Sequence, residues 1–178
     1  DPDIIFKTQA KDSDAIKKGE IIASVSGKAR SILAGERVAL NFLSHLSGIA
    51  TKTHAFATMV KAYRTKILDT RKTTPGLRLL EKYAVRMGGG YNHRFSLDEM
   101  ILIKDNHIRI AGGLDKVKAL PANYKTEIEV KNLEEFASAL RLKPDIIMLD
   151  NMSYKDMKEA VKLRNSLSPQ KINPLPKL

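Results

Sequence analysis

The middle of the chain repeats one pattern, in which a short apolar run ends in charged or polar residues. The four runs are KILDTRK at 66–72, MILIKDNH at 100–107, TEIEVKN at 126–132 and DIIMLDN at 145–151. Segments with a helical spacing of apolar residues lie between them. Short apolar runs that alternate with helices are typical of parallel strands covered by helices. The pattern therefore predicts an α/β fold, with either an open sheet or a barrel.

Three intervening segments predict helices from their apolar spacing and their end signals. They are PGLRLLEKYAVRMG before Gly88, LEEFASAL after Asn132, and SYKDMKEAVKLRN, in which Ser153 and Asp156 are spaced as in a capping box. The three glycines at 88–90 are better explained as a helix stop than as a phosphate-binding loop.

The first part of the chain has a different pattern. Residues 11–35 alternate short β-branched runs with Gly, Ser and Asp, which predicts short antiparallel strands and turns. The next segment, ERVALNFLSHLSG, predicts an amphipathic helix that ends at Gly48.

Polar residues follow each predicted strand. Because ligand sites of parallel α/β folds lie at the carboxyl ends of the strands, these residues are expected on one rim. They are Asp69, Thr70, Arg71, Lys72, Lys104, Asp105, Asn106, His107, Glu129, Lys131, Asp150 and Asn151. A rim that mixes cations with carboxylates suits a substrate that carries carboxylate or phosphate groups and a bound magnesium ion.

Composition narrows the classes of chemistry. The 178 residues are 43% hydrophobic and 29% charged, as in an ordinary globular protein of one or two domains. No apolar run approaches the roughly 20 residues that span a bilayer, and the first residues lack a signal-peptide pattern, so a cytoplasmic location without a membrane partner is expected. Cysteine is absent, which excludes disulfides, thiolate zinc sites and cysteine nucleophiles.

The formal charge of +11 favours anionic partners. The basic residues are dispersed and aromatic residues make up only 6%, which favours small anions over nucleic acid. The spacing of the four histidines is not that of a zinc site, and neither a serine nucleophile elbow nor a P-loop pattern occurs.

Four longer segments identify a protein family more specifically than the alternation of apolar runs and helices does. They are ERVALNFLSHLSGIATKT from Glu36, LDTRKTTPGLRLLEKYAVRMGGGYNHR from Leu68, LIKDNHI from Leu102 and DIIMLDNMS from Asp145. In sequence and in order they resemble the quinolinate phosphoribosyltransferase family, and the match spans most of residues 11–164. The resemblance implies a type II phosphoribosyltransferase fold, with part of an N-terminal α/β sandwich at 1–48. A parallel α/β barrel, complete or incomplete, would carry the active site at 49–178.

The resemblance also implies an activity, a cofactor and an assembly. The enzyme would be a glycosyltransferase that moves a phosphoribosyl group from phosphoribosyl pyrophosphate to quinolinate and releases carbon dioxide, a step of NAD biosynthesis. Magnesium would accompany phosphoribosyl pyrophosphate. A homodimer or an assembly of dimers would be the working form.

Individual roles come from the same resemblance. Quinolinate would be bound by Arg37 of a neighbouring subunit and by Thr70, Arg71, Lys72, His93, Arg94 and Lys104. The catalytic residues would be Lys72, Lys104, Glu129 and Asp150. Of these, Glu129 and Asp150 would face the ribose and magnesium of phosphoribosyl pyrophosphate, and no residue is assigned as a certain metal ligand.

The chain departs from the family after the last match. The Glu-x-Ser-Gly-Gly type segment and a later glycine-containing segment, which help bind phosphate in the family, do not occur, and SLSPQKINPLPKL from Ser166 predicts a non-helical tail. The chain is therefore expected to be either part of a longer enzyme or a divergent relative.

Alternatives stay open at this point. The protein could be a related nicotinate-type phosphoribosyltransferase, a truncated non-catalytic assembly or binding module, or a nucleic-acid binder. Single residues also have structural explanations: Arg37 as a solvated helix arginine, Lys104 as a strand-end lysine in solvent, His93 as a packing residue, and Glu127 with Glu129 as the exposed face of an edge strand.

Overall fold

The structure, a computed structural model, describes residues 1–117 and 119–167. The chain forms two compact units, Asp1–Phe95 and Ser96–Leu178. The proline-containing segment expected to form a non-helical tail lies almost entirely outside the described residues.

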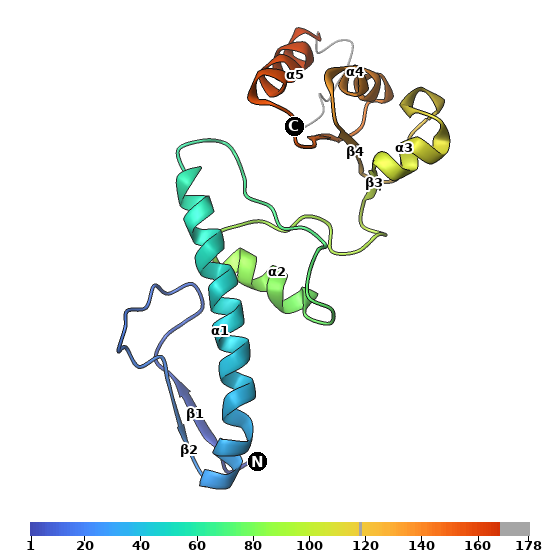
Figure 1. The fold of residues 1–178 in the computed structure, drawn as a ribbon. Coiled ribbons are helices and arrows are strands. Elements are labelled where there is room, and N and C mark those ends of the chain that lie inside the picture. Colours follow the sequence, from blue (N-terminus) through green and yellow to red (C-terminus); the bar gives the residue numbers. More distant parts are fainter. Residues whose placement is uncertain (118, 168–178) are drawn as a thin grey trace. The chain divides into compact units, whose positions relative to one another are not determined.

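The first unit contains a two-stranded sheet and two helices (Figure 1). Strands β1 (Ile5–Thr8) and β2 (Ala23–Ser26) pair antiparallel, and helices α1 (Ala29–Met59) and α2 (Arg78–Met87) follow. The antiparallel pairing expected for residues 11–35 is confirmed in kind, but the bounds were wrong. The first strand precedes residue 11, and the helix begins six residues before the predicted strand region ends.

The prediction that the helix ends at Gly48 was wrong, because α1 continues to Met59. A glycine inside a helix costs only about 1 kcal/mol relative to alanine, so it does not by itself end one. The residues after Gly48 offset this cost through tertiary contacts, since Ala50 and Thr53 pack against the segment that follows α2.

The glycines at 88–90 do end α2, as expected, and they also allow this close approach. A Cβ atom on Gly88 would lie 2.3 Å from the Ala50 carbonyl oxygen, and one on Gly90 would lie 2.7 Å from Thr53 Cγ2. Gly89 adopts a φ of +86°, which glycine tolerates best. The triple glycine is therefore a packing and capping element of the first unit.

The prediction of a regular strand at 66–72 was wrong. Only an isolated parallel bridge joins Leu68 to Tyr91, with the Tyr91 N–H donating to the Ile67 carbonyl at 2.8 Å. From Thr70 onward the chain turns, because the Lys72 N–H donates to Thr70 Oγ1 at 3.0 Å. A local side-chain bond of this kind competes with the pairing of a strand.

The second unit is a parallel sheet with helices. Its elements are β3 (Ile101–Ile103), α3 (Asp105–Ala111), a 3₁₀ turn (Leu114–Lys116), β4 (Thr126–Val130), α4 (Leu133–Leu142), β5 (Ile146–Leu149) and α5 (Tyr154–Ser166). The strand order is β3-β4-β5, and both pairings are parallel. Three of the four predicted strands and the α/β class are therefore confirmed.

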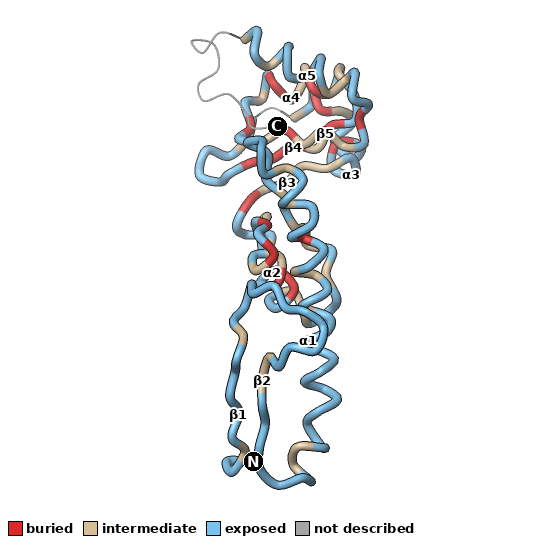
Figure 2. Tube along the Cα trace, turned by 90° about the vertical axis from the view of Figure 1, so that its left-hand side faces the viewer, coloured by how far each residue is buried: buried red, intermediate tan, exposed pale blue. Residues whose placement is uncertain are grey.

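The core of the second unit lies between this sheet and its helices. Ile128 and Val130 of β4, Ile147 of β5, Phe136 of α4 and Ala160 of α5 are fully buried. Figure 2 shows the buried positions in red around α4, α5 and β4. Removal of such apolar surface from water is the main stabilising contribution to a unit of this size.

Side-chain caps define where two of these helices begin. Asn132 Oδ1 accepts the Glu135 N–H at 2.8 Å at the start of α4. At the start of α5, Ser153 Oγ accepts the Asp156 N–H at 3.1 Å and donates to Asp156 Oδ2 at 2.7 Å. The predicted pairing of Ser153 with Asp156 is present. None of the described helices has the length and apolar character that a membrane crossing needs.

Candidate functional site

The side chains of the central strand β4 alternate between a face of the sheet that packs against the helices and a polar face. Ile128 and Val130 belong to the core under the helices, so the alternating residues Glu127 and Glu129 lie on the opposite face. Glu129 is in register with Met148 of β5. Asp150 follows two residues later and therefore falls on the same face as Glu129.

Lys104 reaches this polar face from the end of β3. Its Nζ lies 3.5 Å from Glu129 Oε2, and the two side chains are 40% and 12% exposed. This pair brings together two of the residues predicted for the site. The alternative that Glu127 and Glu129 form the exposed face of an edge strand was wrong, because β4 is central and Glu127 is 3% exposed.

A second ion pair lies beside the first. Lys131 Nζ, just after β4, donates to Asp105 Oδ2 at 2.8 Å. The hydrogen bond from Lys131 lowers the pKa of Asp105, and the same bond, helped by the charge of Asp150, raises the pKa of Lys131. Asp105 and Lys131 thus form an ion pair at the carboxyl edge of the sheet, and the charge of Asp150 acts on Lys131 in the same direction.

His107 has a local role in this region. Its Nδ1 lies 3.0 Å from the backbone nitrogen of Lys104, whose N–H donates to it, so Nδ1 carries no proton in this arrangement. A hollow beside the Lys131 pair is lined by Asp105, Ile108, Arg109, Gly112, Gly113, Lys131 and Glu135. The rim residues at 104–107 and 131 thus belong to one connected polar region.

In the first unit, Asp69 is the centre of a buried polar network. Its Oδ1 forms an ion pair with Lys82 of α2, and the two side chains are only 7% and 2% exposed. The same oxygen accepts the His93 N–H at 2.8 Å. With its amide nitrogen facing Asp69, Asn92 donates to Asp69 Oδ2 and to the Lys82 carbonyl, each at 3.0 Å.

Arg78, one turn before Lys82 on α2, contacts both segments that carry predicted substrate residues. Its Nε donates to Thr73 Oγ1 at 3.2 Å, and its two terminal nitrogens donate to the carbonyls of Arg71 and Phe95, each at 3.4 Å. One guanidinium group therefore joins the turn after Asp69 to the segment after Tyr91.

Glu81 completes the charged face of α2. Its Oε2 accepts the Thr74 N–H at 3.1 Å, and its Oε1 lies 2.8 Å from His45 Nε2 on α1. Hydrogen bonding from the Thr74 side chain, followed by that from His45, lowers the pKa of Glu81 although burial opposes the shift.

The predicted substrate residues of the first unit differ in exposure. Arg71, His93 and Arg94 are half-buried, whereas Thr70 and Lys72 are exposed. Arg71 Nε is buried and has no hydrogen-bond acceptor among the described residues, so the guanidinium retains a donor for a ligand. Arg37 is exposed on α1, which fits either a solvated arginine or contact with another subunit.

Sequence reasoning missed Arg78, Glu81 and Lys82 and gave His45 no specific contact. Their spacing of three and four residues does place the three α2 residues on one helical face. That signal was available, but it could not show that the face is buried against two loops instead of facing solvent.

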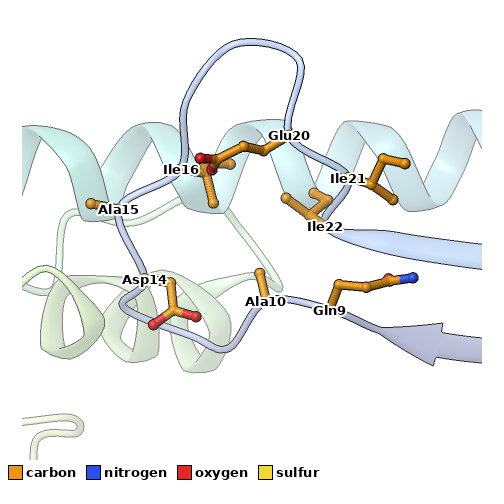
Figure 3. Close-up of a pocket in the computed structure, with 8 residues that line it drawn as sticks. All are labelled: Gln9, Ala10, Asp14, Ala15, Ile16, Glu20, Ile21 and Ile22. Carbon is orange, nitrogen blue, oxygen red and sulfur yellow. The ribbon is translucent and has the colours of Figure 1, made fainter.

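A second hollow lies away from all predicted site residues. Figure 3 shows its lining along the connection between β1 and β2: Gln9, Ala10, Asp14, Ala15, Ile16, Glu20, Ile21 and Ile22. The charged residues of this lining are Asp14 and Glu20, which would repel the carboxylate or phosphate groups of an anionic substrate. Over residues 1–117 and 119–167, no cluster of three or more His, Cys, Asp or Glu side chains is arranged to hold a metal ion.

Comparison with known proteins gives two adjoining family matches. Residues 2–47 match the N-terminal domain, and residues 49–173 the C-terminal domain, of quinolinate phosphoribosyl transferase.

Single relatives agree with the family match. The chain is 45% identical over 174 residues to a probable nicotinate-nucleotide pyrophosphorylase (carboxylating) of Synechocystis, which covers 95% of this chain and 59% of the relative. A Bacillus subtilis protein of the same name is 46% identical, with coverages of 86% and 55%. The structure of the nicotinate-nucleotide pyrophosphorylase from Francisella tularensis matches with a TM-score of 0.85 and 44% identity, over 97% of this chain and 61% of that one. The chain thus spans less than two thirds of these relatives.

Proposed function

Because this chain belongs to the quinolinate phosphoribosyl transferase family, we propose that the whole protein transfers a phosphoribosyl group from phosphoribosyl pyrophosphate to quinolinate. The products are nicotinate mononucleotide, pyrophosphate and carbon dioxide. The observation that best supports this function is the Lys104–Glu129 pair at the carboxyl edge of the parallel sheet, with Asp150 on the same face.

Binding of the quinolinate dianion is the role of the basic residues. Arg71 and Arg94 offer planar guanidinium groups that bind carboxylates through paired hydrogen bonds, and Lys72 and Lys104 add compact charges. Thr70 and His93 supply further polar contacts, and Arg37 serves the site of a neighbouring subunit. The buried Arg71 Nε without an acceptor supports this assignment, because a ligand carboxylate would satisfy it.

The transfer step depends mainly on orientation and charge. The ring nitrogen attacks the anomeric carbon as its bond to pyrophosphate breaks, through a transition state with oxocarbenium character. Glu129 and Asp150 face the ribose, where carboxylates stabilise positive charge. The nitrogen becomes a pyridinium centre, which accepts electron density as the neighbouring carboxylate leaves as carbon dioxide. A proton then replaces that carboxylate on the ring carbon.

The carboxylate oxygens of Glu129 and Asp150 also fit magnesium, which takes one or two protein carboxylates and fills its other positions with water and phosphate oxygens. When bound, the ion neutralises the charge of the departing pyrophosphate. These residues would hold it together with phosphoribosyl pyrophosphate.

A homodimer is the proposed assembly. Helix α1 presents Arg37 among exposed apolar side chains, including Leu33 at 69% and Val38 at 58% exposed. An exposed row of this kind supports contact with another protein surface. The cytoplasmic location expected from the sequence stays a prediction.

The direct test is formation of nicotinate mononucleotide from quinolinate, phosphoribosyl pyrophosphate and magnesium by the complete protein and its Lys104→Ala variant. Loss of this cation should lower kcat/KM by about 10²-fold or more, as for removal of one electrostatic contact to reacting charge. Lys162→Ala is the matched control, because Lys162 is an exposed lysine paired with Glu159 on α5. Equal activity in all three proteins would contradict the site, and no product from the wild type would contradict the function.

The nicotinate-type alternative requires a separate experiment. Quinolinate carries one more carboxylate than nicotinate, so the basic residues should favour quinolinate. A competition titration of the two acids against the same protein decides between them. Tighter binding of nicotinate would overturn the substrate assignment.

A further inference from the structure

Helix α2 carries two cations that the proposed mechanism does not use, a buried Lys82 and a half-buried Arg78. Arg78 and Lys82 lie one turn apart, and each contacts segments that carry predicted quinolinate residues. We propose that Arg78 and Lys82 are positioning residues, which fix the backbone of 69–73 and 92–95 so that Arg71, His93 and Arg94 meet the substrate in one geometry. This inference rests on the proposed function.

Lys82 acts through Asp69. The Lys82 ammonium is 2% exposed and pairs with an Asp69 carboxylate that also accepts the His93 N–H at 2.8 Å. Asn92 donates to the other carboxylate oxygen and to the Lys82 carbonyl. The network thus connects Asn92, through its side chain, and His93, through its backbone N–H, to helix α2.

Arg78 makes further hydrogen bonds to the same two segments, 69–73 and 92–95. Its three hydrogen bonds end on the Thr73 hydroxyl and on the carbonyls of Arg71 and Phe95, so they constrain the chain on either side of the predicted substrate residues. A guanidinium can make such a fork because its donors are fixed in one plane. A lysine at this position could not reach all three acceptors.

Stability alone explains this arrangement poorly. The desolvation of a buried ion pair offsets much of its attraction, and apolar replacements of similar volume are often neutral or stabilising. What a buried charged network does provide is a single geometry, because its hydrogen bonds are directional. Misplacement of a substrate-binding group by about 1 Å can cost on the order of 10²-fold in rate.

The experiment compares two changes on the buried face of α2 with a change on its exposed face. Arg78→Lys keeps the charge but loses part of the fork. The double variant Asp69→Val with Lys82→Met replaces the buried pair by apolar side chains. Arg86→Lys and Arg86→Met are the matched controls, because Arg86 is exposed on the same helix. The complete protein is used, and each variant is assayed for Tm, kcat, the KM of both substrates, and the backbone amide NMR signals of His93 and Phe95.

We expect the KM for quinolinate to rise about tenfold in both buried-face variants, as for loss of about one strong hydrogen bond. The KM for phosphoribosyl pyrophosphate should stay unchanged. The two amide signals should shift or broaden. In the double variant the Tm should fall, because the His93 N–H loses its acceptor as well. A purely structural role would change the KM of both substrates alike, whereas positioning changes only that of quinolinate. The Arg86 variants should match the wild type in every measurement.

An unchanged quinolinate KM with unchanged amide signals in Arg78→Lys would overturn the proposal, and this variant decides the matter if the double variant does not fold. If the wild-type protein makes no nicotinate mononucleotide, the proposed function fails and the amide signals decide alone. Perturbed signals of His93 and Phe95 in the variants then support positioning, and undisturbed signals reject it.

Discussion

Glu81 shows how one carboxylate can hold three parts of the first unit together. It sits on α2, accepts the Thr74 N–H from the turn after Asp69, and lies 2.8 Å from His45 on α1. Both contacts favour the ionised form, so the pKa of Glu81 is lowered from its ordinary value. The charge state of this residue is therefore linked to the stability of the first unit.

The pH dependence of Glu81→Gln tests this linkage. A lowered pKa in the folded state means that the stabilisation is fully present above the unfolded value of about 4.3 and is lost as the pH falls through the lower folded value. At pH 7 the variant should be less stable by about 1.5–3 kcal/mol, the range for hydrogen bonds to charged groups. Urea unfolding of both proteins at pH 7, 5, 4 and 3 measures the difference, which should shrink below pH 4.3. A constant difference would contradict it.

The residues of the polar sheet face could be predicted from sequence, whereas the charged face of α2 could not. Lys104, Glu129 and Asp150 come at or just after short apolar runs, and the alternation of a strand determines their face. Arg78 and Lys82 lie in a helix whose apolar pattern says only where the helix is. Their partners, Asp69 and the carbonyls of Arg71 and Phe95, are brought to them by tertiary packing that no local pattern encodes.

At the level of elements, glycine has opposite meanings in α1 and after α2. A Cβ on Gly48 would meet no atom within 4 Å, whereas one on Gly88 would lie 2.3 Å from a backbone oxygen of α1. From the sequence alone, both Gly48 and Gly88 were predicted to end helices. What distinguishes them is the neighbour, which is solvent in the first case and another helix in the second.

A pair of alanine substitutions makes this contrast measurable. Gly48→Ala should stabilise the protein by about 0.5–1 kcal/mol, because alanine is the better helix former and has room. Gly88→Ala should destabilise it by about 1–3 kcal/mol or more, because the added methyl forces α1 and α2 apart. Thermal or urea unfolding gives both values. Effects of the same sign would contradict the close packing of Gly88 against Ala50.

The start of α5 depends on Ser153. Ser153→Ala removes the acceptor for the Asp156 N–H and should cost about 1 kcal/mol, whereas Ser153→Thr keeps a hydroxyl and should cost much less. Denaturant unfolding of the three proteins checks this expectation, and equal stability of all three would show that the cap contributes nothing.

At the scale of the molecule, the domain boundary predicted after residue 48 does not coincide with the boundary between the two compact units. The family matches change between residues 47 and 49, within the continuous helix α1, whereas the contacts of the chain divide at Phe95 and Ser96. No cluster of proline or glycine marks the latter position in the sequence. The domain assignment of the sequence analysis stays a prediction.

The net charge of +11 gives a prediction for the whole molecule. Quinolinate and phosphoribosyl pyrophosphate are both anionic, and the screening length falls from about 10 Å at 0.1 M salt to about 3 Å at 1 M. The KM of the complete protein for both proposed substrates should therefore rise with potassium chloride concentration. A duplex DNA shift assay at the same salt concentrations is the control. Salt-sensitive DNA binding without any response to quinolinate would instead favour the nucleic-acid alternative.

The strand order β3-β4-β5 leaves β5 with a neighbour on one side only among the described strands. Its outer backbone groups form an edge to which a further strand can add through main-chain hydrogen bonds, whichever polypeptide supplies that strand.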